Sequence, residues 1–281
     1  MSKEELVYKD KKVFDNILEK IKVDGFSKLH VLADFDKTLT KAYSKGQIRP
    51  SLISVLRSEG YLGEEYSKKA YAEYDYYHKI EIDPNIDFDI KKQEMTNWWT
   101  KHLSLLIESG LKKEHLQKVI DSNLIELRDG IKNLLKKFEE FDIPLIIISA
   151  NGLGTNSIEM YLEKEGFLSK NIKVISNEFF WDDKGNAIGY DDRVIHVFNK
   201  DETVLKDYPE IFSLIKDRKN VLLFGDSLGD VGMIEGFSYD NLLKIGFLNE
   251  KKEVLFDEYK NAYDLLFLDD VDALELDNLF F

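Results

Sequence analysis

Several kinds of residue and segment are missing from this 281-residue sequence, and each absence excludes a class of function or structure. The chain has no cysteine, which excludes disulfides, thiolate metal sites and cysteine nucleophiles. It has only 4 prolines, so no proline-rich linker marks a domain boundary. Internal repeats and low-complexity tracts are absent as well, which leaves the hydrophobic pattern as the guide to its organisation.

Long apolar runs and long basic runs are also absent. No segment approaches the roughly 20 apolar residues of a transmembrane helix. Residues 1–14 (MSKEELVYKDKKVF) are charged and lack the apolar centre of a secretory signal. With a net charge of −14 and no run of five basic residues, binding to nucleic acid polymers or to anionic membranes is not expected. We therefore expect a cytoplasmic protein without such partners.

The residues that are present indicate a globular α/β protein. Apolar residues make up 43% of the chain and charged residues 33%, as in soluble domains. Short runs that are apolar on both faces predict parallel strands covered by helices on each side. These runs span residues 30–33, 145–148, 172–175, 221–224, 242–247 and 265–268. We expect a doubly wound, Rossmann-like parallel sheet.

Local patterns between the strands support this organisation. Helical spacing recurs between residues 131 and 138, and a first helix is predicted over residues 13–21. The apolar face of that first helix is predicted to consist of Val13, Ile17, Leu18 and Ile21. The turn DDKGN at residues 182–186, flanked by aromatic and apolar residues, predicts a β-hairpin.

Residues 45–127 have a different character. They are rich in Lys, Glu and Tyr and show helical spacing without strand runs. One predicted helix spans residues 89–109 and ends before Gly110, a residue typical of helix C-termini. We interpret residues 45–127 as a helical cap domain inserted into an α/β core that comprises residues 1–44 and 128–281.

Four polar segments follow predicted strands, at the edge where open α/β sheets bind ligands. The first is DFDKTLT at residues 34–40. Two carboxylates at the end of a buried strand are costly without a cation nearby, and residues two apart in an extended segment point the same way. Asp34 could therefore attack a substrate while Asp36 moves a proton. The alternative is that the pair caps the following turn.

The second and third segments offer groups that suit an anion. Residues 147–152 (IISANG) bring Ser149 to the start of a predicted helix, whose free N–H groups favour negative charge. Residues 197–201 (VFNKD) contain Lys200, which could neutralise a phosphate and a nucleophile together. An ordinary helix cap and a solvent-facing lysine are the alternatives.

The fourth segment is GDSLGD at residues 225–230. Asp226 and Asp230 flank a tight turn after a strand, and hard oxygen ligands without His or Cys nearby suit Mg²⁺. The alternative is a turn that uses Asp and Gly for backbone reasons. The four segments in this order are much more specific than any one of them alone.

Together the segments resemble the four motifs of the haloacid dehalogenase superfamily of phosphohydrolases. The matching residues are Asp34 and Asp36 for the first motif (DxDxT), Ser149 for the second, Lys200 for the third, and Asp226 and Asp230 for the fourth (GDxxxD). Residues 195–200, 225–230 and 243–249 further resemble the cytosolic type III pyrimidine 5′-nucleotidases. So do residues 80–84 and 98–101 in the insert.

This resemblance implies a phosphatase that forms an aspartyl phosphate. Asp34 would attack phosphorus, and Asp36 would protonate the leaving 5′-oxygen and then activate water. Ser149 and the Ala150 amide would hold phosphate oxygens, and Lys200 would offset the negative charge.

The resemblance also implies a Mg²⁺ site beside the nucleophile. The ligands would be the Asp34 carboxylate, the Asp36 backbone carbonyl and the Asp226 carboxylate. Asp230 would lie close by and orient a water molecule or a lysine at the metal. The hydroxyls of Thr38 and Thr40 are expected to tie the turn that follows the nucleophile.

The cap would exclude water and supply substrate contacts. Glu81 matches a family position that contacts the nucleobase, and Trp98 and Trp99 lie where the family has an aromatic residue that stacks on the base. Because adjacent helix residues face different directions, we expect Trp99 to face the base and Trp98 to lie in the cap core. His102, on nearly the same face, is a further candidate substrate contact; a structural role is its alternative.

These features predict a Mg²⁺-dependent 5′-nucleotidase for nucleoside 5′-monophosphates, with pyrimidine bases favoured. Pyrimidine-specific members tend to carry Tyr where this chain has Trp99, so a methylated purine could be accepted. The alternatives are a phosphatase for another small phosphomonoester, phosphotransfer to a nucleoside, and a non-catalytic phosphate-binding or signalling module. A signalling module does not explain the second acid, Asp36. A monomer is expected.

Overall fold

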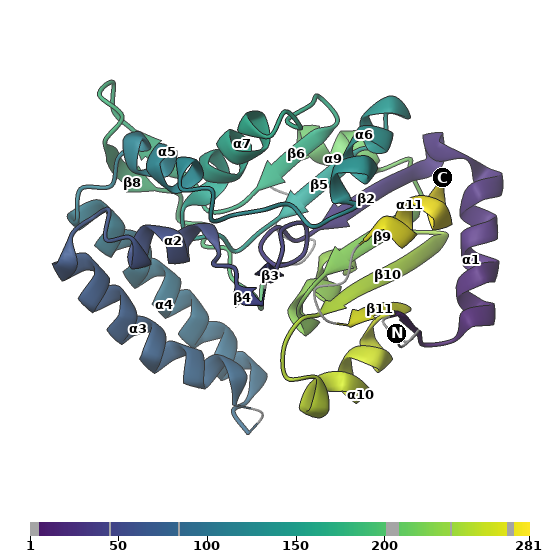
Figure 1. Ribbon diagram of the computed structural model, residues 1–281, viewed down its shortest axis with the longest axis horizontal. Helices are drawn as coiled ribbons and strands as arrows, with labels where there is room; N and C mark the ends of the chain where they lie inside the picture. Colours follow the sequence, from purple (N-terminus) through teal and green to yellow (C-terminus); the bar gives the residue numbers. More distant parts are fainter. Residues whose placement is uncertain (1–5, 45, 84, 201–207, 237, 269–272) are drawn as a thin grey trace.

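The computed structural model describes residues 6–44, 46–83, 85–200, 208–236, 238–268 and 273–281. A seven-stranded sheet carries helices on both faces, and a group of helices stands beside it (Figure 1). The strands are β1 (Leu6–Tyr8), β2 (Leu29–Ala33), β3 (Tyr43–Ser44), β4 (Gln47–Ile48), β5 (Leu145–Ile148), β6 (Ile172–Ile175), β7 (Phe179–Trp181), β8 (Ala187–Tyr190), β9 (Asn220–Gly225), β10 (Asn241–Leu248) and β11 (Leu265–Leu268). The α-helices are α1 (Lys11–Asp24), α2 (Leu52–Ser58), α3 (Glu64–Ile82), α4 (Phe88–Glu108), α5 (Lys113–Asp121), α6 (Ile131–Glu140), α7 (Gly154–Lys164), α9 (Pro209–Ile215), α10 (Lys252–Ala262) and α11 (Leu274–Phe280), and the 3₁₀ helices are η1 (Phe26–Lys28) and η2 (Leu228–Ile234).

The strand order in the sheet is β1-β11-β10-β9-β2-β5-β6, and all neighbours run parallel except β1 and β11. The prediction of a doubly wound parallel sheet is confirmed. Strand β1 was not predicted, because three residues are too few to show a hydrophobic period. The chain runs from β2 outward to β5 and β6 and then returns to β9 on the other side of β2. Strands β2 and β9 therefore meet where the winding reverses, which is the usual ligand site of such sheets.

Side chains of each strand alternate between two hydrophobic clusters, one on each face of the sheet. Val31 and Ala33 pack into a cluster with residues of α1, α6 and α11, whereas Leu32 packs into a cluster with residues of α9 and α10. Burying each large aliphatic side chain stabilises the fold by about 1.5–3 kcal/mol. This two-sided burial is the reason that the central strands are mostly apolar.

Helix α1 confirms the predicted helix but corrects its buried face. The buried residues are Phe14, Leu18 and Ile21. Val13, which was predicted to face the core, is 51% exposed. The buried stripe runs through its neighbour Phe14, whose ring packs edge-on against Tyr8 of the edge strand β1.

Helices α2 to α5 follow one another between β4 and β5, in the segment for which a helical insertion was predicted. Helices α3 and α4 lie side by side, and α5 also packs against α7 of the core (Figure 1). Where the chain enters and leaves the insertion, its two passages are paired. The Lys41 N–H donates to the Glu126 carbonyl (2.8 Å), and the Arg128 N–H donates to the Leu39 carbonyl (2.9 Å). On this ground we propose a cap that spans residues 45–127.

Two local predictions are confirmed. Helix α4 is followed by Gly110 at φ 77°, the left-handed conformation that glycine adopts at helix ends. Strands β7 and β8 form the hairpin, and in its turn Asp182 Oδ1 accepts hydrogen bonds from the N–H groups of Lys184 and Asn186. Among the described residues, no helix combines the length and apolarity that crossing a membrane requires.

Candidate active site

The polar segments after β2, β5 and β9 meet at one edge of the sheet, because these strands are neighbours and run parallel. Asp34 follows β2 and is only 5% exposed. Its N–H donates to the carbonyl of Phe224 in β9 (3.1 Å). Ser149 follows β5, and its N–H donates to the carbonyl of Ile175 in β6 (3.0 Å). The sheet therefore brings the first, second and fourth motifs together.

Lys200 reaches the same edge by another route. Its segment was predicted to follow a strand of the parallel sheet, but it follows β8 of the antiparallel hairpin. Its ammonium donates hydrogen bonds to the Asp34 carboxylate and to Asp230 Oδ1, the latter at 2.9 Å. Burial opposes the charge of the ammonium, but Asp230 and Asp34 outweigh burial and raise the pKa of Lys200. Lys200 is therefore held as a cation between the first and the fourth motif.

Three carboxylates crowd around this lysine. Asp34, Asp226 and Asp230 each place one oxygen within 4.8 Å of the others. Burial raises the pKa of Asp34 well above its usual value, although Lys200 opposes the shift. Burial and the neighbouring Asp230 raise the pKa of Asp226 to about 7. One ammonium does not balance three carboxylates, and a donor set made only of oxygens fits Mg²⁺.

The carboxylate of Asp230 accepts hydrogen bonds at both of its oxygens. Its Oδ2 accepts hydrogen bonds from the N–H groups of Asp226 (3.1 Å) and Ser227 (2.9 Å) and from the Ser227 hydroxyl (2.9 Å). Its Oδ1 accepts from Lys200. These bonds suit a residue that orients the lysine, and direct metal ligation by Asp230 stays a prediction.

Asp36 faces the cap. Its Oδ1 accepts a hydrogen bond from the N–H of Leu52, the first residue of α2 (3.3 Å). Burial raises the pKa of Asp36 to about 6. A carboxyl group with such a pKa can both give and take a proton near neutral pH. The protonation state of Asp36 therefore suits the role predicted for it.

The turn after Asp36 is tied by its two threonines. Lys37 has a left-handed backbone (φ 61°), and its N–H donates to Thr40 Oγ1 (2.8 Å). Thr38 Oγ1 donates to Asp226 Oδ1 (3.4 Å) and so joins the first motif to the fourth. These bonds agree with the structural role expected for both hydroxyls.

The loop between β5 and α7 contains the second motif. Asn151 fixes this loop, because its Oδ1 accepts from the Leu153 N–H (2.8 Å) and its Nδ2 donates to Ser157 Oγ (3.3 Å). Within the described part of the chain, the Ala150 N–H makes no backbone hydrogen bond. It is therefore available to an anion at the start of the helix, next to Ser149.

The two adjacent tryptophans of α4 stack on each other, with ring centroids 5.6 Å apart. Trp98 is 9% exposed and stacks on Tyr77, as expected for a residue of the cap core. Trp99 is half-buried and lies against the second motif, since a Cβ on Gly152 would come within 2.6 Å of its ring. The two rings are less separated than helical geometry suggested. The contact of Trp99 with a base stays a prediction.

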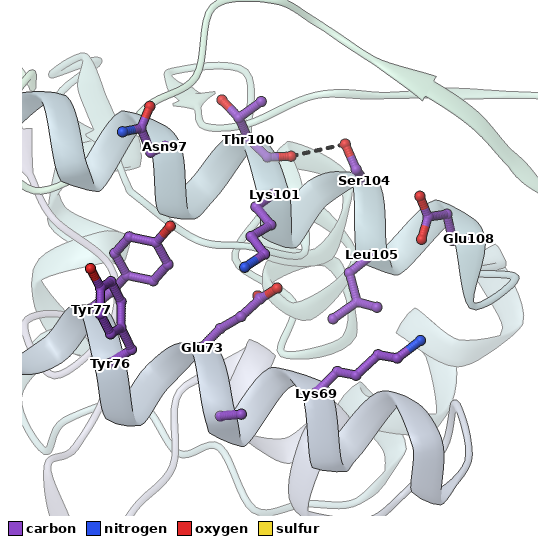
Figure 2. Close-up of a pocket in the computed structure, with 11 residues that line it drawn as sticks. Lys69, Glu73, Tyr76, Tyr77, Asn97, Thr100, Lys101, Ser104, Leu105 and Glu108 are labelled. Carbon is purple, nitrogen blue, oxygen red and sulfur yellow. Dashed lines mark hydrogen bonds between the residues drawn. The ribbon is translucent and has the colours of Figure 1, made fainter.

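His102 is buried inside the cap. Its Nδ1 lies 3.2 Å from Glu73 Oε2, and its Nε2 lies 3.4 Å from the Tyr66 hydroxyl. These contacts favour the structural alternative, and a substrate contact by His102 stays a prediction. Glu73 also lines a cavity of about 1090 Å³ between α3 and α4, as do Lys69 and Tyr77 (Figure 2). No residue of the four motifs lines that cavity.

Glu81 lies in the last turn of α3. Its carboxylate contacts His78 Nδ1 (2.9 Å), and its carbonyl accepts a hydrogen bond from Lys91 Nζ (3.0 Å). The Glu81 side chain is 26% exposed, so a ligand could reach it. Its contact with a base stays a prediction. Two residues of the quoted segments, Pro84 and Asp201, lie outside the described residues.

Three contacts around the site had no signal in the sequence. The Leu52 N–H bonds to Asp36. His196 Nε2 lies 3.0 Å from Thr96 Oγ1 of α4, which joins the cap to the segment that carries Lys200. Arg128 contacts the turn after Asp36. Contacts that use backbone groups, or that join distant single residues, leave no spacing pattern, so only the fold could reveal them.

Comparison with known proteins assigns the chain to a family. A sequence profile described as "Pyrimidine 5'-nucleotidase (UMPH-1)" matches residues 37–279. The chain belongs to the pyrimidine 5′-nucleotidase (UMPH-1) family. The matched region contains Ser149, Lys200, Asp226 and Asp230 and begins directly after Asp36.

Individual relatives agree with this assignment. The 7-methylguanosine phosphate-specific 5'-nucleotidase A of Xenopus laevis is 34% identical over 271 residues, which cover 96% of this chain and 92% of that protein. The corresponding Homo sapiens protein is 32% identical over 251 residues, which cover 89% and 83%.

Solved structures give the same result for the fold. The crystal structure of cytosolic 5'-nucleotidase IIIB bound to cytidine matches with a TM-score of 0.85 and 27% identity, over 99% of this chain and 93% of that one. A substrate-bound phosphoserine phosphatase matches with a TM-score of 0.53 at 18% identity, over 89% and 96% of the chains, and so shares the fold alone. The predicted membership of the haloacid dehalogenase superfamily of phosphohydrolases is confirmed.

Proposed function

We propose that this member of the 5′-nucleotidase family hydrolyses nucleoside 5′-monophosphates, with Mg²⁺, through an aspartyl phosphate on Asp34. The observation that carries the proposal is the meeting of Asp34, Lys200 and Asp226 at one buried edge of the sheet. Membership of a family named for pyrimidine 5′-nucleotidases supports it.

Two carboxyl groups would divide the covalent chemistry. Asp34 attacks phosphorus in line, and the bond from phosphorus to the ribose 5′-oxygen breaks. Asp36 gives its proton to the departing oxygen, and the nucleoside leaves. Asp36 then accepts a proton from the water that attacks the aspartyl phosphate, which releases phosphate and restores Asp34.

Other groups of the chain would hold the phosphate. Lys200 offsets the negative charge of Asp34 and of the transferred group. The Ser149 hydroxyl and the Ala150 N–H bind phosphate oxygens at the start of α7. These donors are set before the substrate arrives, so they cost little reorganisation during the reaction.

The oxygens of the first and fourth motifs would hold Mg²⁺. The ligands from the chain would be the Asp34 and Asp226 carboxylates and the Asp36 backbone carbonyl, with Asp230 beside them. When bound, the ion supplies positive charge that reduces repulsion between a carboxylate and a phosphate dianion. Asp230 keeps Lys200 pointed at Asp34.

For the base, we propose that the cap accepts N7-methylated guanine as well as pyrimidines. The relatives described above are named for 7-methylguanosine phosphate, and the structural neighbour holds cytidine. Methylation at N7 gives guanine a positive charge, which strengthens stacking on an indole such as Trp99. Glu81 can accept a hydrogen bond from the exocyclic amino group that guanine and cytosine both carry.

The test is phosphate release from a panel of phosphate esters, with and without Mg²⁺. The panel contains cytidine, uridine, 7-methylguanosine and unmodified purine nucleoside 5′-monophosphates and several sugar phosphates. We expect release from the cytidine and 7-methylguanosine esters only with Mg²⁺. Asp34→Asn should abolish it, and Asp183→Asn, in the exposed hairpin turn, should not. Equal rates on sugar phosphates would defeat the nucleotidase assignment, and full activity of Asp34→Asn would defeat the mechanism.

We also propose a cytoplasmic location and a monomeric state. The structural neighbour is described as cytosolic, which supports the location. The monomer follows only from the sequence expectation. Fractionation of cells and light scattering of the purified protein would test these two proposals.

A further inference from the structure

Arg128 is a buried arginine at the boundary between cap and core. It is 1% exposed, although it carries a permanent charge. Its backbone lies where the chain returns from the cap, and its N–H donates to the carbonyl of Leu39 (2.9 Å). The neighbouring Leu127 forms an antiparallel bridge with Thr40. The backbone of Arg128 is therefore paired with the chain segment that leaves the first motif for the cap.

The side chain of Arg128 points back to the turn that follows Asp36. Its Nε donates to the Thr38 carbonyl (3.2 Å), and its Nη2 donates to the Lys37 carbonyl (2.6 Å) and to Asn249 Oδ1 (3.2 Å). Asn249 Nδ2 donates to the same Lys37 carbonyl (3.1 Å). The guanidinium carbon lies 4.2 Å from the centre of the Phe247 ring. Two consecutive carbonyls of the catalytic turn are thus held by one planar fork.

These hydrogen bonds from Arg128 matter because the turn after Asp36 has an unusual backbone conformation. Lys37 has a φ of 61°, in the left-handed region that residues with a side chain rarely adopt. Such a backbone persists only when its surroundings hold it. The turn sets the direction of Asp36 on one side, and on the other side the direction of Thr38, whose hydroxyl donates to Asp226 Oδ1 (3.4 Å). Arg128 therefore acts on Asp36 through the backbone of the turn and on Asp226 through the Thr38 hydroxyl.

We propose that Arg128 is a positioning residue: it holds the turn of the first motif in its reactive shape and ties that turn to the base of the cap. The proposal rests on the proposed function, because the reactive shape is that of a phosphatase. None of the contacts described above joins Arg128 to a reacting atom. Lysine cannot replace it, since an ammonium lacks the planar fork that reaches two carbonyls and an amide oxygen together.

The test compares Arg128→Lys with Arg218→Lys. Arg218 is a matched control, because its side chain likewise donates hydrogen bonds to backbone carbonyls, in its case those of Phe26, Leu29 and Asp142. It does so at the amino end of β2, away from the nucleophile. We expect Arg128→Lys to lower kcat for the nucleotide about 100-fold with little change in KM, because small misplacements of reacting groups have effects of this size. Arg218→Lys should keep kcat within about threefold of the wild type.

Chemical rescue and hydrogen exchange separate positioning from general stability. Guanidinium added to Arg128→Ala should restore part of the lost kcat, and added ammonium should not. Amide exchange in residues 37–40 should be faster in Arg128→Lys than in the wild type and unchanged in Arg218→Lys. If Arg128→Ala does not fold, the Arg128→Lys measurements decide alone.

The outcomes are distinct. Unchanged kcat in Arg128→Lys, or equal losses in both lysine variants, would overturn the positioning role. Absence of nucleotidase activity in the wild type would reject the proposed function instead. The amide hydrogen exchange of residues 37–40 would then still show whether Arg128 holds the turn in place.

Discussion

The two ends of the central strands bury polar groups in opposite ways. At the carboxyl end, Asp34, Asp226 and Asp230 place oxygens within 4.8 Å of each other around Lys200. At the amino end of the same strands, His30 Nδ1 donates to the Arg218 carbonyl (2.8 Å). There burial lowers the pKa of His30 to about 4, so this histidine is neutral near pH 7.

The amino end matches its donors with acceptors. The Arg218 side chain donates to carbonyls of three segments, and Asn220 Nδ2 donates to Asp24 Oδ2 (3.0 Å). The carboxyl end instead concentrates like charges that one lysine does not balance. The difference indicates that the amino end serves stability, whereas the carboxyl end gives up stability for a charged ligand. Four predictions test this contrast, in order of the expected effect.

The largest effect is expected for Lys200→Met. Removal of the ammonium leaves Asp34 and a phosphate to repel each other, so kcat/KM should fall about 10³-fold, or roughly 4 kcal/mol. The matched control is Lys216→Met, an exposed lysine near the amino end, which should leave kcat/KM unchanged. A fall of less than tenfold for Lys200→Met would mean that its charge does not stabilise the transition state.

The next effect is expected for Asp36→Asn. A variant without the proton donor should lose about 10²–10³ in kcat on a nucleotide, whose leaving alkoxide needs a proton. On an aryl phosphate with a nitrophenolate leaving group, the loss should stay below about tenfold, since that group departs without protonation. Equal losses on both substrates would remove Asp36 from the role of general acid.

Mg²⁺ should stabilise the folded protein only by binding at the carboxyl end of the central strands. At about 100 times its Kd, an ion that binds the folded state alone adds about 2.7 kcal/mol. For a chain of this length the midpoint of thermal unfolding should rise by about 5 °C. Asp226→Asn should abolish the rise, and Asp24→Asn, at the amino end, should keep it. A rise that persists in Asp226→Asn would place the ion elsewhere.

The smallest effect is expected at the amino end and concerns pH. The pKa of His30 falls from 6.5 to about 4 on folding, because burial disfavours the charged ring. The folded state therefore binds the proton less well than the unfolded state, and stability is full above pH 6.5 and falls as the pH drops toward 4.

Between pH 7 and pH 5 this linkage removes about 2 kcal/mol of unfolding free energy. His30→Asn keeps a donor for the Arg218 carbonyl but does not titrate, so its loss over this interval should be about 2 kcal/mol smaller. Urea unfolding of both proteins at the two pH values measures the difference. Parallel losses would show that His30 is not responsible.

Much of this molecule is determined by the sequence alone, because the determinants are local. Buried parallel strands need short runs that are apolar on both faces, and residues 145–148, 172–175 and 265–268 form strands with the predicted limits. The meeting of Asp34 with Asp226 could also be expected, because segments that follow neighbouring parallel strands gather at one edge of a sheet. Lys200 follows the hairpin strand β8 instead, so the parallel sheet does not by itself predict its place.

Other features depended on the tertiary structure. The edge strand β1 exists because it pairs with β11, a partner more than 200 residues away, and not because its three residues favour a strand. Arg128 donates hydrogen bonds to the Lys37 and Thr38 carbonyls, and the Leu52 N–H donates to Asp36. These contacts involve backbone groups, which are the same at every position of a sequence. The sequence therefore determined the buried parallel strands, the order of the motifs along the chain and the identity of the proposed reacting groups. Only the packed chain decided which backbone groups hold those groups in place, because such contacts depend on distance in space and not on residue type.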